Sequence, residues 1–322
     1  MQRWVLVAEL PRATARLGSL LAARTPPNDT PTCHNGGDER VSLAKAGSRS
    51  VAASLAGQQR RRLRPVLEMA PSPQFVRSIR LVREEVPTFD EYPFSLPAVR
   101  ELFELSFHPA VTFLIGENGS GKSTLLEAIA VAAGFNAEGG SRNFAFKTRA
   151  SHSDLHRYLR LSRGYKRPRD GYFLRAESFY NVASEIDRLD EEPGLGPPIK
   201  LSYGGKSLHA QSHGESFMAL LTERLSGAGL YIFDEPEAAL SPSRQMAALV
   251  RIHELVKKGA QFIIATHSPI LMAYPNSQIF VLGGDTIRDV PYDETEHFSV
   301  TRDFLNNHRR MLQRLLDDEG GR

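Results

Sequence analysis

The sequence predicts an α/β fold in which a mostly parallel β-sheet is covered by helices on both faces. Between residues 109 and 268, short and almost uninterrupted apolar runs alternate with segments of helical spacing. Strands that are apolar along their whole length are typical of sheets buried on both faces. Earlier in the chain, FVRSIRLV (75–82) alternates apolar and polar residues, which predicts a half-buried strand in an antiparallel N-terminal β part.

The first half of the globular region contains three further predicted elements. PAVTFLIG (109–116) is a β-rich apolar run, and KSTLLEAIAVAAG (122–134) has helical spacing and ends in a glycine suited to a helix C-terminus. Residues 172–189 predict a short strand followed by a helix. The stretch at 191–207, dense in Pro and Gly, predicts a loop.

The second half begins with two buried strands, GLYIFDE (229–235) and AQFIIATHS (260–268), with a helix between them. SQIFVL and TIRDV predict a hairpin around GGD. Residues 298–316 predict an amphipathic closing helix. Its apolar side would contain Phe304, Leu305, Leu312, Leu315 and Leu316.

Composition separates residues 1–68 from the rest of the chain. This stretch is rich in Ala, Arg, Ser, Pro and Gly, and it holds 11 Lys or Arg against 5 Asp or Glu, whereas residues 69–322 hold 29 against 32. We expect a disordered basic tail, or a misplaced start with translation beginning at Met69. The pI of about 9.0 therefore does not argue that the globular part binds nucleic acid.

Simple counts exclude several structural features. No stretch approaches the roughly 20 apolar residues that a membrane-spanning helix needs, so we expect no transmembrane segment. Cys33 is the single cysteine, which excludes an intramolecular disulfide and a cysteine-rich metal site. A reducing, cytoplasmic location fits this composition.

A phosphate-binding loop is predicted between the strand at 109–116 and the following helix. GENGSGKST matches G-x-x-x-x-G-K-[ST], the Walker A pattern, in the strand–loop–helix context that the pattern requires. Backbone N–H groups would cradle the phosphates, Lys122 would place its charge on the β- and γ-phosphates, and Ser123 would offer a hydroxyl to Mg²⁺. The nucleotide-binding residues predicted here are Gly116, Glu117, Asn118, Gly119, Ser120, Gly121, Lys122, Ser123 and Thr124.

Two adjacent carboxylates end the strand at 229–235. Asp234 is placed as a Walker B residue that would join Ser123 in holding Mg²⁺, and Glu235 is the expected general base for the attacking water. The alternative is a surface turn with DEP at its corner. The next strand ends in ATHSP, so His267 would lie at the same sheet edge and contact the γ-phosphate.

The order of these motifs resembles that of ABC-type ATPases, in particular the group of AAA-annotated predicted ATPases that lack a membrane domain. The resemblance covers roughly residues 74–290. It implies a P-loop NTPase fold of ABC-ATPase type, with an ATPase domain over 69–322 and a helical lobe at about 135–228. About 90 residues between Walker A and the signature position cannot hold the long coiled coils of SMC-type and DNA-repair relatives.

QSHGES (211–216) falls where this family has its signature loop. By resemblance, Ser212 and Gly214 would reach the γ-phosphate of ATP bound to a second subunit, which implies a head-to-tail homodimer. His213 and Glu215 depart from the usual L-S-G-G-Q core and change the charge facing the triphosphate. Alternatively, Ser212 caps the helix that begins near Glu215, and one hydroxyl can serve both roles.

Three weaker correspondences follow from the same resemblance. EAALSPSRQ (237–245) is similar to the D-loop, with Ser241 where an aspartate is common, and Glu177 stands near the Q-loop position. Tyr92 and Phe94 are candidates for stacking on adenine, with core or loop packing as the alternative.

Residues 142–175 form a basic insert that suits a nucleic-acid backbone with stacked bases. The alternative is a solvated surface of the helical lobe. Its ten cations are Arg142, Lys147, Arg149, Arg157, Arg160, Arg163, Lys166, Arg167, Arg169 and Arg175.

The expected function is binding and hydrolysis of Mg-ATP in a dimer. Three alternatives remain: a nucleic-acid-associated ATPase of a repair or defence type, a nucleotide-dependent binding module with little hydrolysis, and the ATP-binding subunit of a transporter whose membrane partner is a separate chain.

Overall fold

The structure is a computed structural model that describes residues 74–142, 153–192, 197–284 and 286–316. The predicted tail at 1–68 lies outside these residues. By internal contacts the chain separates into two units, Met69–Asn306 and a second unit of Met1–Glu68 with Asn307–Arg322. The site described below belongs to the first unit.

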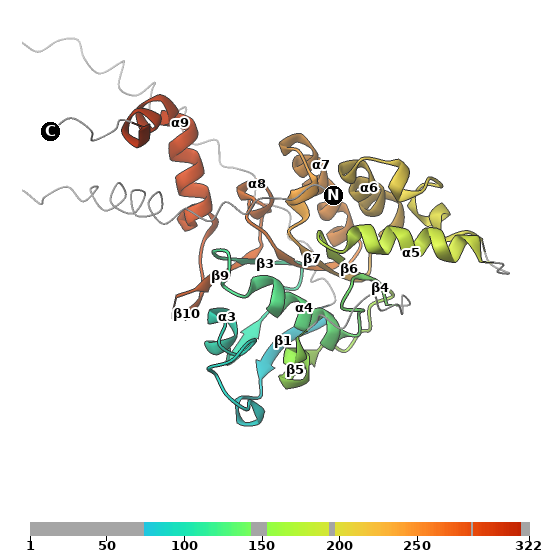
Figure 1. The fold of residues 1–322 in the computed structure, drawn as a ribbon, viewed down its shortest axis with the longest axis horizontal. Coiled ribbons are helices and arrows are strands. Elements are labelled where there is room, and N and C mark those ends of the chain that lie inside the picture. Colours follow the sequence, from blue (N-terminus) through green and yellow to red (C-terminus); the bar gives the residue numbers. More distant parts are fainter. Residues whose placement is uncertain (1–73, 143–152, 193–196, 285, 317–322) are drawn as a thin grey trace, which may run out of the picture. The chain divides into compact units, whose positions relative to one another are not determined.

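The centre of this unit is a seven-stranded sheet in the order β10-β9-β3-β8-β7-β6-β4 (Figure 1). The five inner strands are parallel, and β4 and β10 pair antiparallel at the two edges. This confirms the predicted fold class. The strands are β3 (Val111–Ile115), β4 (Gly140–Ser141), β6 (Asp170–Arg175), β7 (Gly229–Asp234), β8 (Gln261–Ala265), β9 (Gln278–Gly283) and β10 (Thr286–Asp289).

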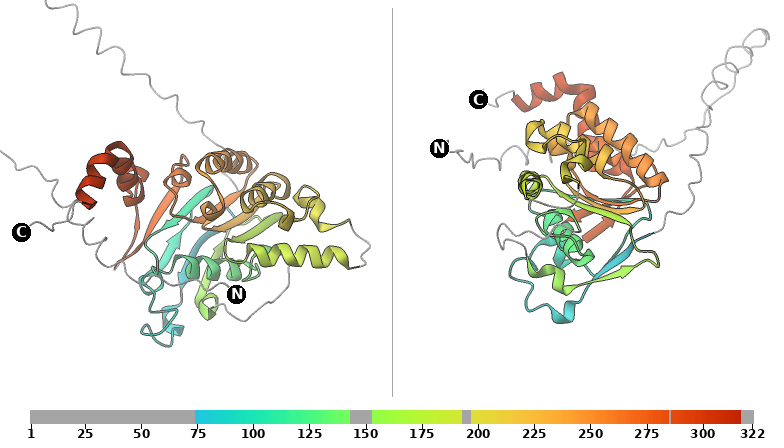
Figure 2. Two further views of the ribbon diagram at one scale, coloured as in Figure 1. Left: turned by 45° about the horizontal axis from the view of Figure 1, so that its top comes forward. Right: turned by 90° about the vertical axis from the view of Figure 1, so that its right-hand side faces the viewer.

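A smaller antiparallel sheet, β2-β1-β5, provides the N-terminal β part. It consists of β1 (Val76–Leu81), β2 (Glu104–Ser106) and β5 (Leu159–Arg163). α4 (Lys122–Ala133) lies between this sheet and the main sheet, and α6 (His213–Ala219), α7 (Pro242–Lys257) and α8 (Pro269–Met272) cover the opposite face of the main sheet (Figures 1 and 2).

Alternate residues of the inner strands enter two separate hydrophobic cores. In β7, Tyr231 and Phe233 pack on the side of α6 and α7, whereas Leu230 and Ile232 pack on the side of α4. A strand with water on one face could not be apolar at all of these positions without a large loss of hydrophobic burial energy. The continuous apolar runs therefore reflect burial on both faces, as predicted.

One buried polar residue joins the two sheets. Gln261, fully buried at the start of β8, accepts hydrogen bonds from the backbone N–H groups of Phe75 (2.9 Å) and Val76 (3.0 Å) through its Oε1. Its Nε2 donates to the carbonyls of Val76 (2.8 Å) and His108 (3.1 Å). The amide thus satisfies backbone groups at the junction that would otherwise be costly to bury.

The range expected as a helical lobe, 135–228, is only partly helical. It begins with β4, β5 and β6, and its helices are α5 (Phe179–Glu191), α6 and a π-helical turn at Leu220–Arg224. β5, which is short and carries two arginines, lies within this range, and its Leu159 and Leu161 pair with β1.

The predicted closing helix is present as α9 (Glu296–Leu316), but its apolar side is not covered in the described part of the chain. No described residue of α9 is buried, and Leu305 and Leu316 are 67% and 73% exposed. Asn307 has non-helical dihedrals (φ −131°, ψ 27°), which interrupt the helix near its middle. The amphipathic pattern predicted the helix correctly but not its burial.

Candidate functional site

The Walker A loop runs from the end of β3 into α4, at the carboxyl edge of the main sheet. Gly119 and Gly121 have φ values of 81° and 94°, which a side chain would strain. Gly116 has no room for one, because a Cβ there would lie 2.0 Å from the carbonyl oxygen of Leu282 on β9. The glycines of the motif are therefore required by local backbone geometry.

Lys122 is the buried cation of this loop. Its Nζ donates to the carbonyl oxygens of Gly116 (2.8 Å) and Glu117 (2.9 Å), so the loop folds around the ammonium group. Burial lowers the pKa of Lys122, and the nearby carboxylates of Glu235 and Asp234 oppose this shift. A positive charge is thus held inside the loop where the motif predicts a phosphate.

Ser123 and Asp234 come together although they are 111 residues apart. Ser123 Oγ donates to Asp234 Oδ1 at 3.0 Å. Asp234 is the last residue of β7 and is 7% exposed, and burial raises its pKa to about 6. A buried carboxylate beside a hydroxyl is costly in the absence of a cation, and it is the kind of ligand pair that Mg²⁺ uses together with phosphate oxygens.

Glu235 has a strained backbone conformation. Its φ and ψ of 48° and 53° lie in the left-handed region, which is uncommon for a residue with a side chain. Its N–H donates to the carbonyl of Ala265 (2.9 Å), and its Oε1 lies 3.6 Å from Nε2 of His267. The turn directs the carboxylate away from the sheet and toward the histidine that follows β8.

His267 is in contact with a third carboxylate, that of Glu237, for which the sequence predicted no role. Its backbone N–H donates to Glu237 Oε1 at 2.5 Å, and the other carboxylate oxygen of Glu237 is buried without a hydrogen-bond partner in the structure. Its ring Nδ1 lies 3.2 Å from Nε2 of His297, the second residue of α9. Glu237 lies in the D-loop-like stretch and His297 on α9, and the packing of the chain brings both to His267.

A buried ion pair between α4 and β6 lies next to Asp234. Glu127 on α4 is 6% exposed and accepts from Arg175 Nη1 at 2.6 Å. Arg175 ends β6 and is paired in register with Asp234, so its charge lowers the pKa of that carboxyl against the effect of burial. A lone glutamate inside the apolar run LLEAIAVAA was the sequence signal for this buried pair.

The signature stretch forms a helix cap within this chain. Ser212 Oγ accepts from the N–H of Glu215 (3.3 Å), and Glu215 Oε2 accepts from the N–H of Ser212 (3.0 Å), which completes a capping box. In the part of the chain that the structure describes, no hydrogen bond or ion pair links Ser212 or Gly214 to residues 116–124. The capping alternative is therefore correct, and it leaves the second role of Ser212 open.

The first residues of this cap differ in their exposure to solvent. Ser212 and His213 are exposed, whereas Gly214 is buried, and a Cβ on Gly214 would lie 2.8 Å from the carbonyl oxygen of Ala239. A cavity of 160 Å³ lies between His213 and Glu235. The start of α6 and the turn after β7 thus line a common cavity within one chain.

The weaker candidates divide between core and surface. Phe94 is buried, with its ring 4.9 Å from and edge-on to that of Tyr158, so it is a core residue and not an adenine contact. Tyr92 is exposed. Glu177 is exposed and raises the pKa of Asp234, and Ser241 caps α7.

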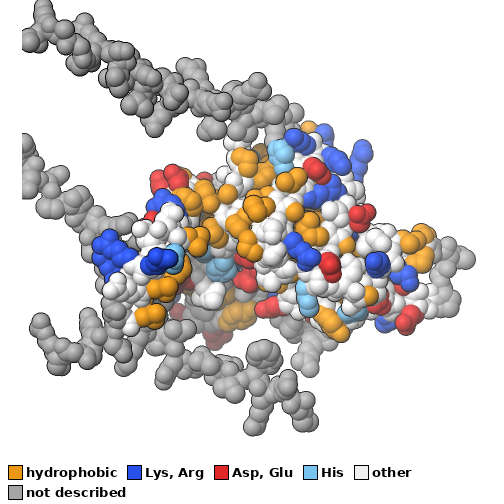
Figure 3. All heavy atoms as spheres, turned by 90° about the horizontal axis from the view of Figure 1, so that it is seen from above, with side chains coloured by type: hydrophobic (Ala, Val, Ile, Leu, Met, Phe, Trp, Pro, Cys, Tyr) orange, Lys and Arg blue, Asp and Glu red, His pale blue; other side chains and the backbone are white. Residues whose placement is uncertain are grey.

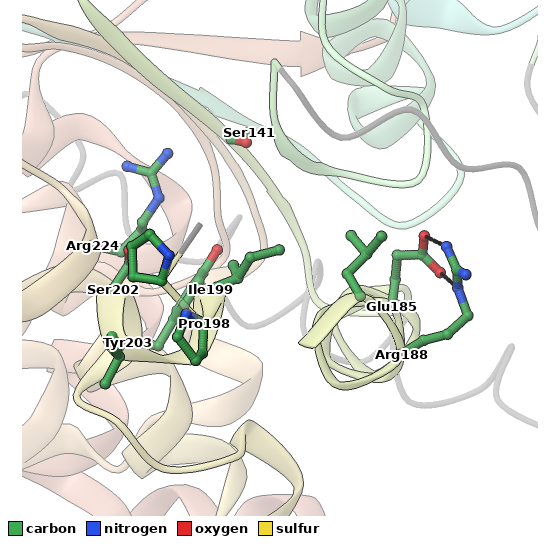
Figure 4. Close-up of a pocket in the computed structure, with 11 residues that line it drawn as sticks. Ser141, Glu185, Arg188, Pro198, Ile199, Ser202, Tyr203 and Arg224 are labelled. Carbon is green, nitrogen blue, oxygen red and sulfur yellow. Dashed lines mark hydrogen bonds and ion pairs between the residues drawn. The ribbon is translucent and has the colours of Figure 1, made fainter. Parts of the chain in front are cut away.

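None of these residues lines a further cavity of 710 Å³ (Figure 4). It is lined by residues of α5, by Ser141 of β4 and by the turn at Ile199–Tyr203. Arg188 and Arg224 also line it, and each is paired with a carboxylate, Arg188 with Glu185 at 2.8 Å and Arg224 with Asp170 at 3.0 Å, so both lining cations are balanced. Cavity size alone does not locate the phosphate site in this fold.

Comparison with known families gives two partial matches. Residues 94–175 match a family described as "AAA domain", and residues 207–273 match one described as "AAA domain, putative AbiEii toxin, Type IV TA system". The first range contains Walker A, and the second contains the signature stretch, Walker B and His267.

Individual relatives are distant. A "Putative ABC transporter ATP-binding protein" of Caldanaerobacter subterraneus is 25% identical over 68% of this chain and 93% of that protein. An ABC transporter G family member of Medicago truncatula is 24% identical over 49% of this chain, which spans only 24% of that longer protein.

Similar solved structures include the ADP conformation of an ATP-binding cassette of an ABC transporter (20% identity, TM-score 0.40, 67% of this chain and 89% of that one). Another is the SMC head domain from Thermotoga maritima (18%, 0.35, 68% and 99%). In the described residues no helix has the length and apolarity to cross a bilayer. With its Walker residues assembled at one sheet edge and its two AAA-domain matches, the chain is a P-loop NTPase with distant similarity to ABC ATPases.

Proposed function

We propose that residues 69–322 form an ATPase that binds Mg-ATP, closes around it as a head-to-tail dimer and hydrolyses it. The observation that carries this proposal is the meeting of Lys122, Ser123 and Asp234 at one sheet edge, with Glu235 and His267 beside them. A buried lysine within a glycine loop and a serine–aspartate pair are the parts that phosphoryl transfer from a nucleotide requires.

Each side chain has a role that follows from its position. Lys122 would bind the β- and γ-phosphates, and Ser123 with Asp234 would hold Mg²⁺, whose charge neutralises the triphosphate when bound. No group of three or more metal-ligating side chains occurs in the described segments, so phosphate oxygens and water would complete the coordination. Glu235 would accept a proton from the attacking water, and His267 would contact the γ-phosphate.

The dimer is proposed from exposed side chains at the start of α6 and on α7. Ser212 is exposed at the N-terminus of α6, a position suited to contact an anion on another molecule. α7, which packs beside α6, leaves Met246 and Val250 56% and 61% exposed, and hydrophobic side chains are visible on this face of the molecule in Figure 3. A second copy seated here would cover these side chains and complete the site.

Turnover at different protein concentrations tests this proposal directly. If the site is completed in trans, ATPase turnover per chain of the full-length protein should rise with protein concentration and then level off, because the active species is the dimer. Light scattering with ATP and Mg²⁺ should show the dimer over the same range. A rate per chain that is constant across the range would contradict the dimer but not ATP hydrolysis.

A second function, contact with nucleic acid, is favoured because some cations of the basic insert are ion-paired whereas others gather around one cavity. Arg157, Arg160 and Arg175 are neutralised by ion pairs. Lys147 and Arg149 lie outside the described residues. Four cations instead converge on a cavity of 380 Å³, and they are Arg142, Arg163, Lys166 and Arg167.

This cationic cavity has the features of a phosphate-backbone site. Burial lowers the pKa of Arg142, and Arg163 lowers it further, so the two guanidinium groups repel one another in the absence of an anion. Tyr165 lines the cavity, is 80% exposed and has Lys166 Nζ 5.5 Å from its ring centroid, so a base could stack on its exposed face beside a cation. Leu230 lines the cavity near the start of β7, whereas Asp234 ends that strand. The two sites therefore lie at opposite ends of the parallel strands.

Neutralising Arg163, Lys166 and Arg167 to glutamine should therefore abolish single-stranded DNA or RNA binding and any stimulation of ATPase turnover by it. Binding of the unmodified protein should weaken steeply with salt, since three to four phosphate contacts release counterions. The matched control replaces the ion-paired Arg157 and Arg160 by glutamine and should bind normally. Fluorescence anisotropy with a labelled oligonucleotide provides the measurement, and equal binding by both variants would assign the insert to a solvated surface.

A further inference from the structure

The ring of His267 is fixed on one side by a histidine from a distant helix. His297 Nε2 lies 3.2 Å from His267 Nδ1, and the two ring centroids are 5.4 Å apart. On the other side of the ring, His267 Nε2 is buried without a hydrogen-bond partner in the structure and lies 3.6 Å from Glu235 Oε1. The imidazole therefore lies between a second imidazole and the proposed general base.

The carboxylate indicates which nitrogen of His267 holds the hydrogen. A lone pair on Nε2 would be repelled by Glu235 and by the oxygen of a γ-phosphate, whereas an N–H at this position is attracted to both. With hydrogen on Nε2, Nδ1 has only a lone pair and requires a donor. His297 Nε2–H is the donor at hydrogen-bonding distance.

His297 is suited to donate because it is neutral and its position is fixed. Burial lowers its pKa, and His267 and Lys122 lower it further. Thr295, 1% exposed, accepts from the N–H of Phe298 (3.3 Å) through its Oγ1 at the start of α9. Just before it, Tyr292 Oη donates to the carbonyl of Pro269 (2.9 Å), which ties the entrance of α9 to the segment that follows His267.

We propose that His297 is a positioning residue that keeps the hydrogen of His267 on Nε2, where it can be donated to the γ-phosphate. The proposal rests on the proposed ATPase function, and it adds α9 to the elements that build the nucleotide site. His297 acts through His267 and does not touch the nucleotide itself.

Substituting His297 should lower kcat and leave ATP binding unchanged. In the full-length protein, His297→Ala should reduce kcat about 10- to 100-fold, the range found when an orienting hydrogen-bond partner is removed, with KM and Kd for ATP unchanged. His297→Gln, whose amide N–H can reach a similar position, should recover most of the loss. His253→Ala is the matched control, because His253 is also half-buried and bonded through its ring, to Tyr274 Oη at 3.1 Å.

A double substitution separates a positioning role from a general loss of structure. If His297 acts through His267, His297→Ala should have no further effect on kcat in a His267→Ala background. A loss by the same factor in both backgrounds would overturn the proposal, as would full turnover of His297→Ala.

A spectroscopic measurement does not depend on turnover. In ¹⁵N-histidine-labelled protein without nucleotide, His267 should show the chemical shifts of a hydrogen on Nε2, and His297→Ala should change them to those of a tautomer mixture, with His267→Gln assigning the signal. An unchanged tautomer would overturn the role of His297. If the protein has no ATPase turnover but the tautomer changes as expected, the proposed function is refuted and the role of His297 is not.

Discussion

Replacing Glu235 with glutamine is expected to lower kcat for ATP by about 10²- to 10⁴-fold while ATP remains bound. Glutamine has the same shape and keeps a hydrogen-bond acceptor, so the turn after β7 and the bond from its N–H to Ala265 should persist. What is lost is the group that accepts a proton from water. Because product would form slowly, ATP should accumulate on the protein and stabilise the closed dimer.

The expected result is measured by incubating the Glu235→Gln protein with labelled ATP, separating it by gel filtration and analysing the bound nucleotide. Unhydrolysed ATP should elute with a species of twice the chain mass. Glu223→Gln, an exposed carboxylate outside the site, provides the control for loss of one negative charge. Turnover equal to that of the unmodified protein would remove Glu235 from the role of base, and Glu237, which contacts the same histidine, would become the next candidate.

The main sheet was predictable because each inner strand needs only its own residues to indicate burial on both faces. The strands that escaped prediction have weak local signals: β2 and β4 have three and two residues, and β5 is LRLSR. The role of Gln261 could not be predicted from the sequence either. This polar residue at the start of β8 is fully buried because the backbone groups of Phe75, Val76 and His108, far away in the sequence, supply its hydrogen-bond partners.

The residues of the site also divide into those with a local sequence signal and those without one. Walker A and the Asp234–Glu235 pair lie within short stretches whose geometry is local, and they could be placed from the sequence. Glu237 and His297 were not found, since both act on His267 from elsewhere in the chain, and His297 lies on a helix that was predicted only for its apolar side. Packing, not pattern, brings such residues to a site.

Mixing two inactive variants is expected to restore ATPase turnover. Lys122→Ala removes the phosphate-binding cation, and Ser212→Asp places a negative charge where the signature loop would meet the γ-phosphate of the other subunit. Each variant alone forms two defective sites. A mixed dimer has one intact site, in which Lys122 from one chain faces Ser212 from the other, and one site with both defects. With equal, random mixing the rate per chain should reach about a quarter of the unmodified value.

The choice of aspartate makes this result specific to the role of Ser212 across the dimer. Asp and Asn can both accept the capping bond from the N–H of Glu215, but Ser212 Oγ also donates to Glu215 Oε2 at 2.7 Å, and only Asn keeps a donor for that carboxylate. Ser212→Asn is thus the matched control: it keeps the cap without the added charge and should retain much of the turnover. If the mixture of Lys122→Ala and Ser212→Asp chains stays inactive while both bind one another, each site is completed within its own chain. Full turnover of Ser212→Asp chains on their own would instead make Ser212 only the cap of α6.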